Sequence, residues 1–327
     1  MSTAAFQRPE IVQALDIDAI PLGSIGRYRV VLSENATGNE TLVPVIVVRS
    51  EAPGPIVGVT AALHGNELNG IPVIHRLVRV LSEVYLKSGT VVAVPIANVP
   101  GYVREQREFE DGVDLNRIMP GNPRGTESQL YAHRLLDRIV RHFDYLIDLH
   151  TASFGRINSL YVRANMEDPE PARLARLLAP QIIVHNHGGD STLRGAAAAL
   201  GIHAVTIEVG NPQRLQPGLV RSTGLGIQEV LEHLGMIDDV SDPDEHEIIE
   251  CSRSYWMRTD RGGILRVLPE LTDRVQKGDV VARLTNVWGD LVREYAATDD
   301  GIVVGKSTNP AARAGSRVLH LGIVKQL

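Results

Sequence analysis

The sequence predicts an α/β fold, in which helices flank a mixed, largely parallel sheet and a small all-β domain follows at the C-terminal end. Between Tyr28 and Val209, short apolar runs alternate with helix-like segments, a pattern typical of parallel sheets with connecting helices. Several of these runs are almost continuously apolar, as expected of strands that are buried on both faces. Beyond residue 247, short strands and glycine-containing turns follow one another without a convincing helix.

The predicted strands are apolar runs bounded by turn residues. They cover residues 42–49, 56–63, 90–96, 143–149, 159–164 and 203–209. The neighbouring runs YRVVL and LVPVIVV resemble the two arms of a hairpin, so we expect an antiparallel edge on the sheet.

Three segments show the spacing of amphipathic helices. Residues 125–143 begin with the capping-box pattern TESQ, which favours a helix start. A second helix is expected to begin around Glu67. The third covers residues 224–235 and ends at Gly235, a residue that suits a helix C-terminus.

An acidic, proline-containing stretch, MIDDVSDPDEHE, interrupts the pattern after Gly235 and is typical of a linker. We therefore expect a large α/β domain over residues 1–240 and a small β-rich domain over residues 241–327. The small domain is expected to cover the cleft of the larger one.

The composition indicates a folded protein whose partners are small molecules. Of 327 residues, 43% are hydrophobic and 22% are charged, and the net charge of -6 provides no basic field for nucleic acid or anionic lipid. No segment approaches 18 consecutive apolar residues, so we expect no membrane insertion. The single cysteine, Cys251, suits a reducing cytoplasm, where we expect the protein to reside. The sequence leaves the oligomeric state open and is compatible with a homo-oligomer.

Polar clusters follow two of the predicted strands. His64 and Glu67 come after the run 56–63, and His150 closes the run 143–149. Ligands bind at the carboxyl ends of strands in open α/β sheets, so these side chains are expected to converge. Two imidazoles and one carboxylate are a ligand set of catalytic zinc. The pattern His-x-x-Glu is weak by itself, and an ordinary polar turn is the alternative.

Further polar residues strengthen the metal interpretation. Glu208 ends another predicted strand, where a carboxylate that is not a ligand can act as general base and then as general acid. The long charged loop EQREFEDGVDLNRIMPG contains Arg107, Asn116 and Arg117, and such loops usually serve function. Arginine offers a planar fork for a carboxylate.

Two aspartates, Asp114 and Asp148, are expected to orient the ligand histidines through hydrogen bonds. The sequence leaves open which aspartate pairs with which histidine.

Four motifs in this order resemble the succinylglutamate desuccinylase and aspartoacylase family of the zinc carboxypeptidase-like superfamily. They are HGNE at 64–67, R-x(6)-DLNR-x-x-PG at 107–121, DLHT at 148–151 and IEVGNPQ at 207–213. The resemblance covers about residues 40–235, and the β-rich C-terminal part is similar to the second domain of the family.

The resemblance implies a zinc-dependent reaction with one Zn²⁺ per chain. His64, Glu67 and His150 would bind the zinc, and Glu208 would act as general base and acid toward zinc-bound water. Arg107 would polarise the scissile carbonyl and stabilise the oxyanion.

The resemblance also implies how substrate is held. Asn116 and Arg117 would hold a substrate carboxylate, and Arg194 would meet a further acidic group. The segment with Arg156 and Asn158 departs from the aspartoacylase pattern and is expected to line a differently shaped pocket.

Another His-x-His pair, His185 and His187, is interpreted as a polar strand exit at the pocket rim, with a second metal site as the alternative.

The sequence thus predicts a zinc-dependent amidohydrolase that removes an acyl group from an N-acyl amino acid or a similar small carboxylate-bearing amide. The alternatives are a zinc carboxypeptidase acting on a peptide-like substrate and a non-catalytic zinc-containing binding protein. The acyl group and the amine product are not defined by the sequence.

Overall fold

The structure is a computed structural model that describes residues 8–238 and 247–325. Within these ranges the strands are β1 (Glu10–Val12), β2 (Ser24–Glu34), β3 (Glu40–Arg49), β4 (Ile56–Ala61), β5 (Thr90–Val94), β6 (Tyr145–His150), β7 (Arg156–Asn158), β8 (Leu160–Ala164), β9 (Ile182–His185), β10 (His203–Val209), β11 (Ile249–Arg258), β12 (Gly263–Val267), β13 (Arg274–Val275), β14 (Val280–Thr285), β15 (Leu291–Ala296), β16 (Gly301–Ser307), β17 (Ala311–Ala312) and β18 (Arg317–Val324). The α-helices there are α1 (Gly70–Glu83), α2 (Val99–Val103), α3 (Glu127–Arg138), α4 (Pro169–Leu177), α5 (Leu193–Ala199) and α6 (Pro217–His233). Two short 3-10 helices are η1 (Leu115–Arg117) and η2 (Val140–His142).

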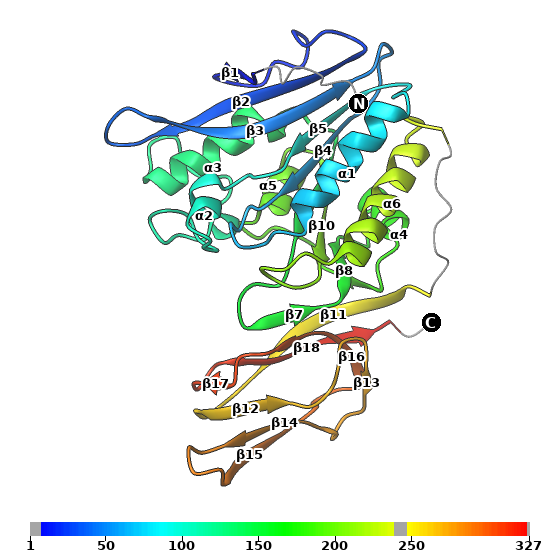
Figure 1. Cartoon of the computed structure of the whole chain (residues 1–327). Coiled ribbons are helices and arrows are strands. Elements are labelled where there is room, and N and C mark those ends of the chain that lie inside the picture. Colours follow the sequence, from blue (N-terminus) through cyan, green and yellow to red (C-terminus); the bar gives the residue numbers. More distant parts are fainter. Residues whose placement is uncertain (1–7, 239–246, 326–327) are drawn as a thin grey trace.

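One long mixed sheet runs through the molecule (Figure 1). Its hydrogen-bonded order is β1-β2-β3-β5-β4-β6-β10-β8-β9-β11-β18-β16-β13, with β7 paired to β16. The central strands β5, β4, β6 and β10 are parallel, whereas β3 joins β5 and β8 joins β10 in antiparallel fashion. The predicted mixed α/β sheet is therefore confirmed, as is the antiparallel hairpin of β2 and β3.

Helices cover both faces of the central sheet, which explains its continuously apolar strands. Along β5, Val91 and Ala93 pack into the same core as α1, α4 and α6. The alternate residues Val92 and Val94 pack into a second core with α3 and α5. Successive side chains of a strand point to opposite faces, so every position of β5 is buried.

Each predicted strand is present, but the boundaries near the site differ. The run 56–63 was expected to be extended throughout, whereas β4 ends at Ala61 because Ala62 adopts a positive φ of 50°. The helix expected around Glu67 begins instead at Gly70. Glu67 lies in a turn, where its backbone N–H donates to the carbonyl oxygen of His64 at 3.1 Å.

The two other predicted helices are shifted at their ends. The segment 125–143 is divided into α3 and η2, because the backbone of Ile139 leaves helical geometry at φ -129°. Helix α6 begins at Pro217, earlier than expected, and Gly235 follows its end with a φ of 67°.

The C-terminal strands continue the long sheet. Residues 249–251 of β11 pair in parallel with residues 182–184 of β9, and β18 and β16 follow in order. The strands β15-β14-β12-β17 form a smaller, separate sheet. No helix is found between residues 247 and 325, in agreement with the prediction.

The predicted linker reaches into residues 239–246, and the expected domain boundary at 240 lies outside the described residues. Among the helices of the described ranges, none combines the length and apolar character that a membrane span requires.

Candidate active site

The turn between β4 and α1 contains His64 and Glu67 and packs closely against α2. At Gly65, a Cβ atom would lie 2.0 Å from the carbonyl carbon of Gly101. The glycine is therefore required by this close approach of two backbones. Asn69 fastens the same turn to the end of β10, because its Nδ2 donates to the carbonyl oxygen of Val209 at 2.8 Å.

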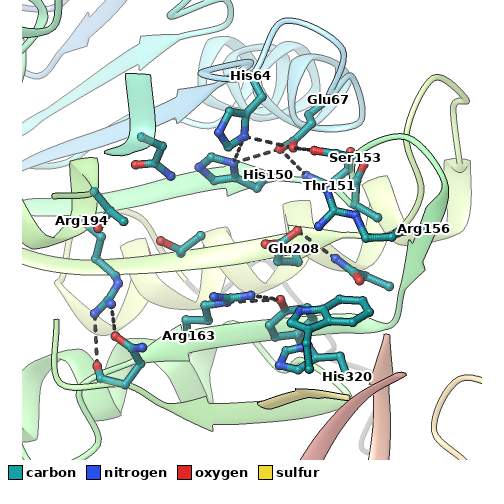
Figure 2. A pocket seen from close by; sticks show the side chains of 18 of the residues that line it. His64, Glu67, His150, Thr151, Ser153, Arg156, Arg163, Arg194, Glu208 and His320 are labelled. Carbon is teal, nitrogen blue, oxygen red and sulfur yellow. Dashed lines mark hydrogen bonds and ion pairs between the residues drawn. The ribbon is translucent and has the colours of Figure 1, made fainter. Parts of the chain in front are cut away.

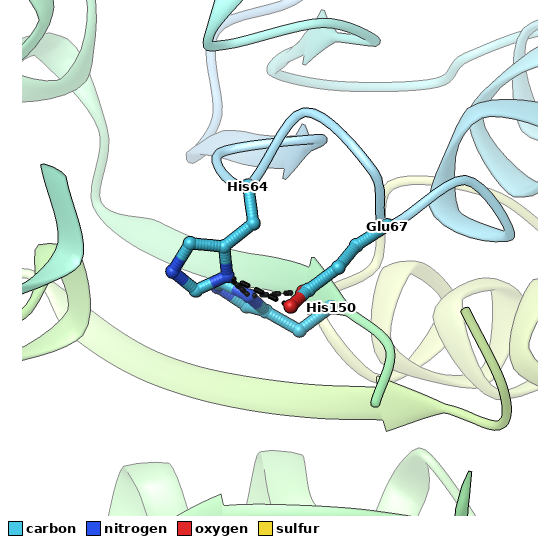
Figure 3. Close-up of side chains that lie close together, drawn as sticks. All are labelled: His64, Glu67 and His150. Carbon is cyan, nitrogen blue, oxygen red and sulfur yellow. Dashed lines mark hydrogen bonds and ion pairs between the residues drawn. The ribbon is translucent and has the colours of Figure 1, made fainter. Parts of the chain in front are cut away.

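His64, Glu67 and His150 form a buried three-residue cluster (Figure 3). The Nδ1 atom of His64 lies 3.0 Å from Glu67 Oε1, and the Nδ1 atom of His150 lies 2.9 Å from Glu67 Oε2. The two Nδ1 atoms are 3.1 Å apart. The three side chains each offer one ligand atom within 4.8 Å of the others, so the predicted convergence is observed.

Aspartates bind the outer nitrogen of each histidine. His64 Nε2 lies 3.1 Å from Asp114 Oδ1, and His150 Nε2 lies 2.7 Å from Asp148 Oδ2. These contacts answer the pairing question that the sequence left open. A carboxylate at Nε2 keeps the proton there and leaves the lone pair on Nδ1, which faces the cluster centre. The donor set thus fits a divalent transition metal.

The ionisation of the cluster favours positive charge at its centre. Burial raises the pKa of the Glu67 carboxyl, but His64 and His150 outweigh burial and hold that pKa well below its usual range. Burial lowers the pKa of His150, but Asp148 and Glu67 raise it well above the usual imidazole value. A bound cation would supply the charge that protonation supplies otherwise.

Arg107 lies beside this cluster. Its Nη1 donates to Glu67 Oε1 at 2.9 Å, and its Nη2 donates to Asp114 Oδ2 at 3.0 Å. Ser153 contacts both Arg107 and Glu67. Burial lowers the pKa of Arg107, but the two carboxylates outweigh that effect and raise it. The guanidinium is therefore charged and is held next to the ligand atoms.

Glu208 points into the same space as His150. The two residues are register partners on the parallel strands β10 and β6, so their side chains project from the same face of the sheet. Asn158 Nδ2 donates to Glu208 Oε2 at 3.1 Å. Glu208 makes no hydrogen bond to His64, Glu67 or His150, so its carboxylate is available as a separate acid or base.

All eight predicted site residues line one cavity of about 440 Å³. Glu208 lies between the cluster and the part of the cavity wall that contains Arg163 and His320 (Figure 2). These residues are His64, Glu67, Arg107, Asn116, Arg117, His150, Arg194 and Glu208.

The residues expected to hold substrate are partly engaged with the protein. Asn116 Oδ1 accepts a hydrogen bond from the backbone N–H of Leu193 at 2.7 Å, and Arg117 Nη1 donates to the carbonyl oxygen of Asn116 at 2.9 Å. Arg194 donates to the carbonyl oxygen of Asn186 at 3.2 Å and also contacts the side chain of Asn186. Both arginines are thereby oriented at the cavity wall.

Several cavity residues have no counterpart in the sequence-based prediction. They include Tyr161, Arg163, Ser254, Tyr255, Trp256, Arg317 and His320. Arg163 donates to the hydroxyl of Tyr161 from its Nε at 3.2 Å and from its Nη2 at 2.5 Å. The only sequence signal for Arg163 is the alternation of inward and outward positions along the predicted strand 159–164. The C-terminal residues have no such signal, because pairing between strands distant in the sequence brings them to the cavity.

His185 and His187 lie outside this cavity, although Asn186 between them lines it. The interpretation that the two histidines lie at the pocket rim stays a prediction. With Glu167 they form another group of metal-ligand type. The backbone N–H of Met166 donates to His185 Nδ1 at 3.1 Å, which places the ring proton on Nε2, 3.2 Å from His187 Nε2. This tautomer favours a hydrogen-bonded histidine pair over metal ligation.

Cys251 is buried, and burial raises the pKa of its thiol to about 12, as expected of a packing residue.

A cavity at the strand ends of an α/β sheet, with convergent titratable groups, is typical of an enzyme of the α/β class. The sequence matches the family model described as the succinylglutamate desuccinylase/aspartoacylase catalytic domain over residues 53–234. The chain therefore belongs to the succinylglutamate desuccinylase/aspartoacylase family, as its motifs predict, and the prediction of an amide-hydrolysing enzyme agrees with this family.

Individual relatives support the assignment over most of the chain. The sequence is 27% identical over 330 residues to N-alpha-acetyl-L-2,4-diaminobutyric acid deacetylase of Halomonas elongata, with 95% of each chain covered. It is 28% identical over 258 residues to succinylglutamate desuccinylase of Pseudomonas paraeruginosa, which covers 66% of this chain and 77% of the relative. The crystal structure of a succinylglutamate desuccinylase/aspartoacylase from Rhodobacter sphaeroides superimposes with a TM-score of 0.84 at 27% identity, covering 96% of this chain and 99% of that one.

Proposed function

We propose that the protein is a zinc-dependent deacylase that removes the acyl group from an N-acyl amino acid or a similar small carboxylate-bearing amide. The names of the relatives, a deacetylase and a desuccinylase, support this reaction class. Residues 1–240 would form the catalytic part, and residues 241–327 would cover its cleft.

One observation carries the proposal: a buried His–Glu–His cluster shares a cavity with a carboxylate outside the cluster. The cluster supplies three ligand atoms, and Glu208 is aligned with His150 across neighbouring strands. A binding protein needs the ligands alone, whereas a hydrolase also needs a base.

His64, Glu67 and His150 would hold the zinc ion through the two Nδ1 atoms and a carboxylate oxygen. When bound, Zn²⁺ polarises a carbonyl and lowers the pKa of water to about 7. Asp114 and Asp148 would keep the ligand nitrogens oriented, as their contacts with Nε2 of each ring support.

Glu208 would take the proton from the attacking water and return it to the nitrogen of the leaving amine. Its hydrogen bond from Asn158 engages Oε2 and leaves Oε1 for the proton. Arg107 would stabilise negative charge on the carbonyl oxygen, since its guanidinium lies beside the cluster. A preorganised donor of this kind contributes roughly 3 to 4 kcal/mol to transition-state stabilisation.

Asn116, Arg117 and Arg194 would bind the carboxylates of the amino-acid part. All three line the cavity, and the two arginines are oriented by hydrogen bonds to backbone oxygens. A charged fork held in place binds a carboxylate with little loss of side-chain entropy.

The shape of the cavity favours a small substrate over a peptide. Strands β11 and β18 contribute Trp256, Arg317 and His320 to its wall, so the C-terminal part narrows the cleft. A carboxypeptidase would need room for the chain that precedes the scissile bond.

The test is to incubate zinc-loaded protein with a mass-resolved panel of N-acyl amino acids and short peptides. We expect amine release from acyl amino acids by the wild type, and a loss of about 10²- to 10⁴-fold in the isosteric variant Glu208→Gln. Glu294→Gln removes an exposed ion pair on β15 and serves as the matched control. C-terminal trimming of peptides would indicate a carboxypeptidase, and no turnover despite bound zinc would contradict a deacylase.

A further inference from the structure

The C-terminal strands place a stacked aromatic pair in the cavity wall. Trp256 and His320 are register partners on β11 and β18. Their rings lie 5.1 Å apart at an interplanar angle of 11°. Both residues line the cavity, and His320 lies on the side of Glu208 away from the His64 cluster (Figure 2).

Two arginines pack against this indole. The guanidinium carbon of Arg156 lies 6.0 Å from the ring centroid of Trp256, and that of Arg317 lies 5.2 Å from it. Arg156 comes from β7 and Arg317 from β18, so segments distant in the sequence meet here. Cation–π contacts hold guanidinium planes in place without using their hydrogen-bond donors.

Among the described residues, Arg156 and Arg317 make no side-chain hydrogen bond and no ion pair, although both line the cavity. The other cavity arginines each contact a carboxylate, hydroxyl, amide or carbonyl oxygen. Glu208 and Glu67 attract the Arg156 guanidinium without forming an ion pair, and burial together with Arg107 still lowers its pKa. Unused donors on half-buried guanidinium groups favour an anionic ligand.

His320 adds a third unused group. It is 3% exposed, its Nε2 lies 2.8 Å from Ser254 Oγ, and its buried Nδ1 has no hydrogen-bond partner among the described residues. Burial lowers its pKa well below the usual value, and Arg163 and Arg156 lower it further, so the ring is neutral. The neutral ring adds no positive charge to this wall and supports Trp256 by stacking.

We propose that Arg156, Trp256 and Arg317 form an anion subsite that binds the terminal carboxylate of a dicarboxylic acyl group. The assignment to the acyl side rests on the proposed function. Arg194 lies on one side of Glu208 and Arg156 on the other, so an amide bond beside Glu208 directs its two ends to different arginines (Figure 2). An acetyl group has no charge to offer Arg156 and Arg317.

The test compares two substrates that differ only in charge. An N-succinyl amino acid carries the terminal carboxylate, and the N-succinamoyl analogue replaces it by an uncharged amide. For the zinc-loaded wild type, we expect kcat/KM to be about 10- to 100-fold higher for the succinyl compound, as for loss of a charge-assisted hydrogen bond.

The variants Arg156→Gln and Arg317→Gln should each remove most of this preference, so that kcat/KM falls much more for the succinyl compound than for the succinamoyl compound. Arg156→Lys, which keeps the charge, should restore part of it. Arg253→Gln is the matched control, because Arg253 packs over Tyr255 at 5.7 Å on the same strand and does not line the cavity. Thermal unfolding confirms that each variant is folded.

Equal kcat/KM values of the wild type for both substrates, or equal losses on both substrates in the two variants, would overturn the subsite. A preference that instead follows a carboxylate on the amine side would overturn the acyl assignment. If the wild type hydrolyses neither compound and none of the other N-acyl amino acids in the panel, the proposed function fails. Calorimetric measurement of binding of the same two compounds then tests the subsite. The subsite requires that the wild type binds the succinyl compound more tightly than the succinamoyl compound, and that Arg156→Gln weakens binding of the succinyl compound.

Discussion

The hydrogen bond between Asp148 and His150 provides a sensitive test of the proposed metal centre. Asp148 is fully buried, and its Oδ2 lies 2.7 Å from His150 Nε2. Its Oδ1 accepts a hydrogen bond of 2.6 Å from the hydroxyl of Thr60, the register partner on β4. The substitution Asp148→Asn keeps the volume and one acceptor, so it removes charge and creates no cavity.

We expect Asp148→Asn to weaken zinc binding by about 10- to 100-fold, or roughly 1.4 to 2.7 kcal/mol, because the carboxylate no longer raises the basicity of Nδ1. Competition with a chelator of known affinity measures the change, and circular dichroism confirms folding. Thr60→Val is the control, since it removes the hydrogen bond to the other oxygen and leaves the carboxylate in place. Wild-type affinity in folded Asp148→Asn would refute the reasoning.

Three further predictions concern residues around the same cluster. Arg107→Gln should lower kcat by roughly 10²- to 10³-fold with little change in zinc content, which steady-state kinetics and metal analysis measure together. In metal-free protein, burial raises the pKa of the Asp114 carboxyl, but His64 and Arg107 outweigh burial and hold this pKa well below its usual value. The carboxylate therefore stabilises the folded state above about pH 4, and this stabilisation decreases as the pH falls further. Urea unfolding of Asp114→Asn should therefore show a stability deficit at pH 7 that shrinks toward pH 3, and a constant deficit would contradict it. Gly65→Ala should destabilise the fold by about 1 to 3 kcal/mol, because the new Cβ would meet the backbone of Gly101 at 2.0 Å, and a midpoint of thermal unfolding equal to that of the wild type would oppose this.

Much of the catalytic cleft could be predicted because its signals are local. His64 and Glu67 follow one strand, His150 ends another and Glu208 ends a third, so the carboxyl-end rule of α/β sheets brings them together. What the pattern missed is backbone geometry. The positive φ of Ala62 shortens β4 and leaves Glu67 in a turn before α1.

The far wall of the cavity could not be predicted, because it depends on pairing between distant segments. Trp256 reaches the cavity through the pairing of β11 with β9, and His320 and Arg317 follow on β18. Strand register over such separations has no local signature.

Anomalous diffraction at the zinc absorption edge, from crystals of protein loaded with one equivalent of zinc, tests the central claim most directly. We predict one peak per chain, bonded to His64 Nδ1, His150 Nδ1 and a carboxylate oxygen of Glu67. A peak at Glu167, His185 and His187 instead, or no peak within the cavity of Glu208, would contradict the account.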